Sequence, residues 1–271
     1  MIQTEFAERV VEALKDDASV IGLAAGGSWI TGELDEWSDL DLVLVTREKV
    51  SHDPGLMREY AQRFGLLLSA FTGEHVGESR LLICLYDEPL LHVDIKFLTT
   101  SELKDRVEDP VVLLDRNDEL AMLFSSTQPS WPQTDAQWIE DRFWIWIHYA
   151  TQKLGRGEYF EAIDFLAFLR ATVLAPLLQL SKAQNARGMR RVEETFTQQE
   201  LRQLVATLST YDAPSIIRSL NTCIDIYRKL RTQVFPENIN YRTAAEERAV
   251  AYLGHVEQLV GNIAIPRLSG L

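Results

Sequence analysis

The stretch GGSWITGELDEWSDLDLVLV, residues 26–45, decides how the first half of this chain is interpreted. It places Asp39 and Asp41 one residue apart within a run of Leu and Val. Side chains alternate between the two faces of a strand, so both carboxylates are expected on the same face. Like charges held close together and partly buried repel one another unless a cation lies between them. The stretch therefore predicts a cation site on an apolar strand.

The residues just before these acids form a candidate phosphate contact. The segment SVIGLAAGGS, residues 19–28, is typical of an apolar strand that runs into a turn at Gly26, Gly27 and Ser28. Glycines let the backbone approach a ligand closely, and N–H groups at a helix start can hold a phosphate. A Gly-Gly-Ser turn without any ligand is also common, so the turn gains its meaning from the acids that follow it.

A third carboxylate stands alone in a later apolar segment. Asp94 lies between Val93 and Ile95 in LLHVDIKFL, residues 90–98, and each acid alone could equally be a strand-end or solvent-facing residue. Magnesium prefers oxygen ligands and commonly uses one or two protein carboxylates, with water and phosphate oxygens completing its shell. Asp94 could complete such a site or accept the proton of an attacking hydroxyl. Together the three acids and the turn predict phosphoryl-transfer chemistry.

Length and composition indicate a two-domain globular protein. The chain has 271 residues, 46% hydrophobic and 25% charged, which exceeds the usual size of a single core. The N-terminus lacks the basic and apolar regions of a signal peptide, and we expect that no segment approaches the apolar length needed to cross a membrane. Cys84 and Cys223 lie far apart among apolar residues and are expected as reduced core thiols. These features predict a cytoplasmic protein without a membrane partner.

The negative charge is concentrated in the first part of the chain. Residues 1–125 contain 11 Lys and Arg against 25 Asp and Glu, a net charge of -14, whereas residues 126–271 contain 16 against 15. A protein that grips long DNA or RNA would be expected to carry a basic stripe, so long nucleic acids are disfavoured as partners. A cationic or metal-escorted small substrate fits better, although acidity also simply favours solubility.

Hydrophobic periodicity divides the chain near FSSTQPSWPQTD, residues 124–135. Before this junction we expect an α/β (α+β) domain, residues 1–128, with a mixed sheet and flanking helices. Its predicted elements are helices over 3–16 and 54–65 and strands within 19–28, 40–46, 65–73, 80–87 and 90–99. After the junction we expect an all-helical bundle domain, residues 129–271, with helices over about 135–154, 157–182, 198–209, 213–234 and 242–263.

The motifs together resemble a known superfamily. Gly27-Ser28, Asp39-x-Asp41 and Asp94 look like the signature of the DNA polymerase β-like nucleotidyltransferases, over roughly residues 18–100. A transferase unit followed by a helical domain is similar to the antibiotic adenylyltransferases that act on aminoglycosides and lincosamides. The segment FWIWIHYATQKLGRGEYFEAIDFLAFLR, residues 143–170, also resembles the streptomycin 6-adenylyltransferase group, although aromatic stripes at helical spacing are usually core.

The resemblance implies roles for the matching residues. Gly27 and Ser28 would contact the nucleotide phosphates, Asp39 and Asp41 would bind Mg²⁺, and Asp94 would be the third metal ligand or the general base. ATP or another NTP would be the co-substrate, and the helical domain would hold substrate or close over the nucleotide. Antibiotic adenylyltransferases often use a separate glutamate as base, and the acids near the predicted strands are Glu78, Asp87 and Glu88.

Two further charged groups are candidates for substrate contacts. Arg190 and Arg191 lie with Arg187 in NARGMRRVEE, residues 185–194, where a triphosphate would attract them, although solvated loop arginines are equally ordinary. Acidic residues between the turn and Asp39 would suit a polycationic acceptor, and an exposed charged loop explains them as well: Glu33, Asp35 and Glu36.

The sequence thus predicts a magnesium-dependent nucleotidyltransferase that moves a nucleoside monophosphate, AMP from ATP in the first instance, to a hydroxyl of a small acceptor. An aminoglycoside-like antibiotic is one candidate acceptor. Two alternatives stay open: a catalytically idle or toxin-antitoxin-type module with the same fold, and a protein-AMPylating enzyme. A third alternative is that the motifs occur by chance in an unrelated α/β fold.

Overall fold

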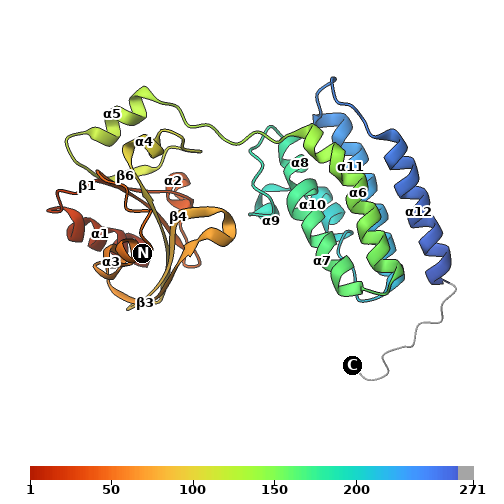
Figure 1. Ribbon diagram of the computed structural model, residues 1–271, viewed down its shortest axis with the longest axis horizontal. Helices are drawn as coiled ribbons and strands as arrows, with labels where there is room; N and C mark the ends of the chain where they lie inside the picture. The colour runs from red at the N-terminus through yellow and green to blue at the C-terminus, as the bar shows by residue number, and fades with distance from the viewer. Residues whose placement is uncertain (262–271) are drawn as a thin grey trace. The chain divides into compact units, whose positions relative to one another are not determined.

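A computed structural model describes residues 1–261 of the chain (Figure 1). The chain divides into two compact units, Met1–Pro132 and Gln133–Leu271, which we call unit 1 and unit 2. In Figure 1 the colour runs from red α1 to yellow-green α5 through unit 1, and from green α6 to blue α12 through unit 2. Each unit has its own hydrophobic core and is described by itself.

Unit 1 is a mixed α/β unit built on six strands, β1 Val20–Ala25, β2 Leu40–Thr46, β3 Leu66–Gly73, β4 Glu78–Asp87, β5 Leu91–Leu98 and β6 Val111–Asp115. Its α-helices are α1 Ile2–Leu14, α2 Ser28–Thr31, α3 Pro54–Gln62, α4 Thr100–Leu103 and α5 Glu119–Ser126, with a 3-10 turn at Glu74–Val76. The strand order is β3-β4-β5-β2-β1-β6. The pair β2 and β5 is parallel, and the other neighbouring pairs are antiparallel.

The two faces of this sheet are covered differently. On one face the alternating apolar side chains of β2, Leu40, Leu42 and Leu44, are buried in a core shared with α1 and α3. On the other face a smaller cluster forms where β1, β2 and β5 meet α4 and α5, and it includes Leu98 and Leu120. Asp41 and Val43 are only half-buried. The start of β2, at Asp41, is therefore left available for polar chemistry on this second face.

The predicted mixed sheet with flanking helices is confirmed, with two differences. The strand β6 and the helices α4 and α5 were not predicted. For β6 the reason is that it is a five-residue edge strand whose first residues are exposed, so its sequence carries little alternation. Asp39 was expected inside a strand, but β2 begins at Leu40, so Asp39 directly precedes it. The two residues directly before Leu40, Ser38 and Asp39, are polar, and the strand starts where the run of apolar side chains begins.

Unit 2 is entirely helical within residues 133–261. Its helices are α6 Ala136–Gly155, α7 Tyr159–Leu169, α8 Ala175–Leu180, α9 Val192–Thr195, α10 Gln198–Val205, α11 Ala213–Val234 and α12 Thr243–Gly261. Residues 262 and 263, the end of the predicted last helix, lie outside the described residues. The core is formed by the inward faces of α6, α7, α8, α11 and α12, with the ring of Phe143 stacked on that of Tyr227 at 3.6 Å between centroids.

The predicted helix over 157–182 is not a single α-helix but two α-helices joined by a π-helical turn. A π-helical turn, Arg170–Leu174, joins α7 to α8 immediately before Pro176. By length and composition alone, the stretch Tyr159–Leu180 is long and apolar enough to cross a membrane. The prediction that no segment approaches this length was therefore wrong. Half of this stretch is buried inside the protein, as in a core helix, because its apolar side chains pack within unit 2.

Candidate functional site

The glycine turn that follows β1 has a backbone that only glycine adopts readily. Gly27 has φ 58° and ψ -134° and stands immediately before the four-residue helix α2. The N–H groups of Trp29 and Ile30 bond to the carbonyls of Gly26 and Gly27. Within the described residues, no hydrogen-bond partner is recorded for the N–H groups of Gly27 and Ser28 or for the Ser28 hydroxyl. These donors are therefore available to a ligand such as a phosphate.

The same turn lies directly against Asp41. The N–H of Gly26 donates to the carbonyl of Asp41 at 2.9 Å. A Cβ placed on Gly27 would lie 2.0 Å from Oδ2 of Asp41, a distance that real atoms do not reach. The absence of a side chain at Gly27 is thus what lets the carboxylate of Asp41 sit beneath the turn. A cation held by Asp41 would be next to any phosphate held by the turn.

The parallel pairing of β2 with β5 brings Asp41 and Asp94 together. The two residues are direct partners in the register, between the pairs Leu40 with Val93 and Leu42 with Ile95. Partners on neighbouring strands are about 4.8 Å apart and point to the same face of the sheet. Their flanking apolar residues are buried on the opposite face, so the register cannot slip by one residue without moving apolar side chains to the wrong side.

Asp94 feels both burial and neighbouring charges. Burial raises the pKa of Asp94, the charge and hydrogen bond of His92 lower it, and the negative charge of Asp39 raises it further, with a net upward shift. Nε2 of His92 lies 2.9 Å from Oδ1 of Asp94. Asp39 is therefore within electrostatic reach of Asp94. The structure places all three acids predicted from sequence where the start of β2 pairs with the middle of β5.

These residues fit an open magnesium site rather than a closed one. Among the side chains that the structure describes, no three or more His, Cys, Asp and Glu are gathered closely enough to enclose a metal. Asp41 and Asp94 are instead a neighbouring carboxylate pair beside unused N–H donors. Magnesium is commonly bound by one or two carboxylates, with water and phosphate oxygens as its other ligands. The donor set is the one such an ion would use.

The structure also separates the alternative bases. Glu78 is bound by Arg80 and Lys96, each at 2.7 Å, and chiefly the Arg80 hydrogen bonds hold its pKa at about 2. Glu88, with φ 61°, begins the turn between β4 and β5, and its N–H donates to Oδ1 of Asp87. His92, which the sequence reasoning missed, lies on the site instead. The signal was its two-residue spacing from Asp94 on one strand.

The predicted arginines belong to unit 2. Arg190 is exposed in the loop between α8 and α9. Arg191 has φ 52°, stands before α9, and lies 3.8 Å from the carboxylate of Glu194. Their predicted contact with a nucleotide held by unit 1 stays a prediction. Gln179 binds this loop through the carbonyl of Gly188 and the N–H of Arg187.

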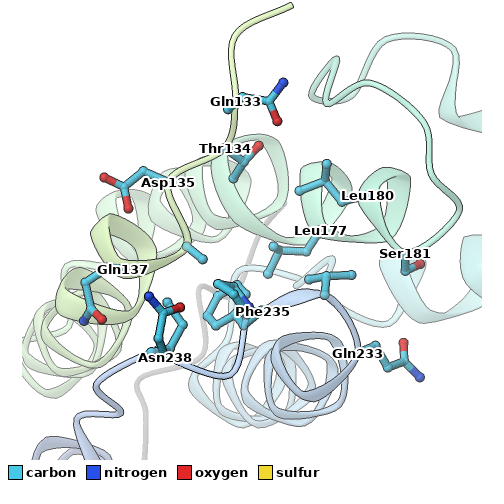
Figure 2. A pocket seen from close by; sticks show the side chains of 14 residues that line it. Gln133, Thr134, Asp135, Gln137, Leu177, Leu180, Ser181, Gln233, Phe235 and Asn238 are labelled. Carbon is cyan, nitrogen blue, oxygen red and sulfur yellow. The ribbon is translucent and has the colours of Figure 1, made fainter.

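Unit 2 contains a pocket of about 650 Å³ at the start of α6 and the ends of α8 and α11. Figure 2 shows Leu177 and Phe235 near the middle of this pocket, with Gln133, Asp135 and Gln233 around them. Its volume lies in the range of small-molecule sites. The 14 lining residues include no Lys or Arg, so the pocket offers no counter-charge for a phosphate and suits a neutral or cationic molecule with an apolar face.

Comparisons with known proteins identify a family and several similar structures. The family model described as streptomycin adenylyltransferase matches residues 2–256. No curated protein matches the chain. An aminoglycoside 6-adenyltransferase from Bacillus subtilis is similar in structure, with 17% identity and a TM-score of 0.40, over 94% of this chain and 98% of that one.

Two further solved structures are similar over nearly the whole chain. A nucleotidyltransferase-like protein from Exiguobacterium sibiricum 255-15 has 13% identity and a TM-score of 0.39, over 96% of this chain and 90% of that one. A spectinomycin adenyltransferase from Enterococcus faecialis, solved with ATP and spectinomycin, has 11% identity and a TM-score of 0.31, over 96% of this chain and 98% of that one.

Proposed function

The chain belongs to the streptomycin adenylyltransferase family and is a nucleotidyltransferase, and on this basis we propose that it transfers AMP from ATP to a hydroxyl group of a small acceptor. The acceptor class we propose is a hydroxylated, amine-bearing antibiotic or a metabolite of similar chemistry. We propose a cytoplasmic location, where ATP and magnesium are both present. The site is the turn and acid group of unit 1, formed by Gly27, Ser28, Asp39, Asp41 and Asp94.

The observation that carries the proposal is the register pairing of Asp41 with Asp94 beneath a turn that has unused donors. A fold that needed Asp94 only for stability would compensate its charge fully, as buried carboxylates require. Asp94 has His92 as its recorded partner, and the net effect of its surroundings is to raise its pKa, which means that its ionised form is disfavoured. A bound cation would reverse this disadvantage.

The proposed reaction is an in-line displacement at the α-phosphorus of ATP. The acceptor hydroxyl oxygen forms a bond to that phosphorus, the bond to the bridging oxygen of the β-phosphate breaks, and pyrophosphate leaves. The acceptor proton must be taken up by a base within hydrogen-bond reach. Asp94 is the proposed base or metal ligand, and His92 would orient its carboxylate. The Gly27 and Ser28 donors would hold the phosphates in place.

Asp39, Asp41 and Asp94 would hold Mg²⁺. When bound, the ion would neutralise charge on the triphosphate and stabilise the leaving pyrophosphate. Unit 2 would supply the remaining substrate contacts, and its pocket at the start of α6 is a candidate for part of the acceptor. We propose Arg190 and Arg191 of unit 2 as further nucleotide contacts.

Isothermal titration with a non-hydrolysable ATP analogue, with and without magnesium, tests the site. We expect magnesium-dependent binding that weakens about 100-fold or more in Asp39→Asn/Asp41→Asn, because removing the charge partners of a bound ion costs about 2–5 kcal/mol. The control is Asp16→Asn/Glu59→Gln, which removes two negative charges elsewhere in unit 1 from exposed positions. Equal weakening in the control would show that only the general field is acting.

Turnover with radiolabelled ATP then tests the reaction class. Streptomycin, spectinomycin and a lincosamide are offered as acceptors, and the expected product is an adenylylated acceptor with release of pyrophosphate. A binding-only result, with nucleotide held tightly and no acceptor modified, would favour the idle-module alternative. Label appearing on protein substrates instead would favour AMPylation of proteins.

A further inference from the structure

Trp37 is the most exposed large apolar side chain among the described residues, at 85% exposure. No other tryptophan in residues 1–261 exceeds 40%. It lies in the loop of residues 32–39 that joins α2 to β2, and therefore between the phosphate-contacting turn and Asp39. Tryptophan offers a large rigid surface with only two side-chain torsions, which is why it is enriched at contact sites.

The loop that carries Trp37 is held in one conformation by hydrogen bonds. Oδ1 of Asp35 accepts from the N–H of Trp37 and from the hydroxyl of Ser38, each at 2.9 Å. The N–H of Asp35 in turn donates to Oγ of Ser38 at 3.0 Å. Trp37 is thus exposed on a backbone that is already ordered, and a ligand that contacts it does not have to fix the loop.

A buried amide from α1 anchors the same loop. Gln3 is 1% exposed, and its Nε2 donates to the carbonyls of Asp35 at 2.9 Å and of Ser38 at 2.7 Å. Its Oε1 is buried without a partner among the described residues. Burying an amide costs free energy unless its polar atoms are bonded. Its amide group donates both hydrogen bonds to the loop, so Gln3 acts as a positioning residue for the segment that contains Trp37 and leads to Asp39.

The charge around Trp37 selects the sign of a ligand. Glu33 and Glu36 lie in the same loop, Asp39 follows it, and no Lys or Arg occurs between residues 16 and 46. A cation over the face of a tryptophan is attracted by the ring quadrupole, and carboxylates nearby add to that attraction. An anionic group would be repelled unless magnesium accompanied it. The loop therefore suits a positively charged ring better than a base or a free phosphate.

We propose that Trp37 is a specificity-determining residue that forms one face of the acceptor site and selects a cationic, ring-bearing acceptor by stacking and cation–π contact. This inference rests on the proposed function, because it assigns the acceptor side of the same reaction. Gln3 positions the loop from behind and does not touch the acceptor.

Difference fluorescence tests the contact directly. Titrations of the full chain and of Trp37→Phe are compared, so that the difference reports the exposed indole, with Trp138→Phe in unit 2 as the matched control. The probes are streptomycin, spectinomycin and a lincosamide, each with the magnesium-bound ATP analogue present, and the analogue alone. We expect the Trp37 signal to change with at least one cationic acceptor and not with the analogue alone.

Kinetics gives the second readout. Trp37→Ala is expected to raise the KM for the acceptor about tenfold and to leave the KM for ATP nearly unchanged. Trp37→Phe, which keeps an aromatic face, is expected to lose less. Gln3→Met, of similar size without the donors, is expected to raise the acceptor KM without removing the indole.

The outcomes separate this inference from the proposed function. A Trp37 signal that responds to the nucleotide analogue alone would place the ring at the base and overturn the acceptor assignment. Acceptor binding that leaves Trp37 unaffected would overturn it as well, as would nucleotide binding without binding of any cationic acceptor. Absence of magnesium-dependent nucleotide binding would contradict the proposed function itself.

Discussion

Two groups of buried or half-buried carboxylates in this protein are treated in opposite ways. In unit 2, Glu140 is fully buried, and it accepts from Nε1 of Trp144 at 3.1 Å, from the hydroxyl of Tyr227 at 2.6 Å and from the N–H of Arg242 at 2.9 Å. The guanidinium of Arg231 lies 3.4 Å away. In unit 1, Asp94 is hydrogen-bonded to His92. It pairs with Asp41 across the sheet and feels the negative charge of Asp39.

We propose that the difference separates a structural carboxylate, Glu140, from a functional one, Asp94. Every oxygen of Glu140 is satisfied by the helices that bury it, so its charge is part of the folded core. Asp94 sits where the fold raises its pKa and leaves its charge incompletely compensated. Carboxylates of this kind are concentrated at functional sites, and the proposed cation would complete the charge of Asp94. Four stability experiments test this comparison.

The largest effect is expected at Glu140. Glu140→Ala should lower the free energy of unfolding by about 3–5 kcal/mol, because it leaves Tyr227, Trp144 and the N–H of Arg242 without their buried partner. Urea denaturation followed by helical circular dichroism measures it. Glu237→Ala, an exposed glutamate of unit 2, is the control and should stay within about 0.5 kcal/mol. A loss below about 1 kcal/mol would remove Glu140 from the comparison.

A smaller loss is expected at the turn above Asp41. Gly27→Ala should cost about 1–3 kcal/mol and weaken nucleotide binding, because the new Cβ meets Oδ2 of Asp41 and the backbone has φ 58°. Gly32→Ala is a matched control, since Gly32 has φ 69° but nothing within 4 Å of an added Cβ. Denaturation and titration of both variants isolate the contact with Asp41. Equal behaviour of the two would mean that only backbone strain matters.

Glu78 tests an acid of the same sheet that the protein does compensate. Arg80 and Lys96 lower its pKa from 4.5 to about 2, so its ion pairs stabilise the folded state above pH 4.5 and lose that effect as the pH falls from 4.5 toward 2. Glu78→Gln should therefore destabilise by about 0.5–1 kcal/mol at pH 7, since the pair is partly exposed. Thermal melts at several pH values measure whether the difference from the native chain shrinks in that window.

The smallest effect, and the opposite sign, is expected at Asp94. Its raised pKa means that the ionised form costs stability above the folded-state pKa, and that this cost disappears as the pH falls toward the usual 3.8. In EDTA, Asp94→Asn should therefore melt slightly higher than the native chain at pH 7, with the difference closing on acidification. A lower melting temperature at pH 7 would show that the fold needs this carboxylate, as it needs Glu140.

Much of the candidate site followed from local patterns. The apolar run after Asp39, the Gly-Gly-Ser turn and the isolated Asp94 predicted strands, a turn and three acids, because alternation and glycine content are properties of neighbouring residues. The strand boundaries at Leu40–Thr46 agree with the prediction, and α6 and α11 lie within a residue of theirs. The edge strand β6 escaped because a short exposed strand lacks that alternation.

Other features depend on residues far apart in the chain and could not be read from any one segment. The pairing of Asp41 with Asp94 requires β5 to lie parallel to β2, and that register follows from the apolar side chains that both strands bury against α1 and α3. The contact of His92 with Asp94 gains meaning only once that face is known to hold the acids. The anchoring of the Trp37 loop by Gln3 joins residues more than 30 positions apart.

The sequence by itself determined which residues are candidates for the chemistry: a glycine turn, three aspartates and an acidic loop between the turn and Asp39. The tertiary structure decided which of them meet, because packing of the apolar faces sets the strand register and the turn positions. It alone distinguished Glu140 and Glu78, whose charges are compensated, from Asp94, whose charge is compensated only in part. The physical reason is that a carboxylate's cost depends on what surrounds it in space, and its neighbours in sequence are only a part of that surrounding.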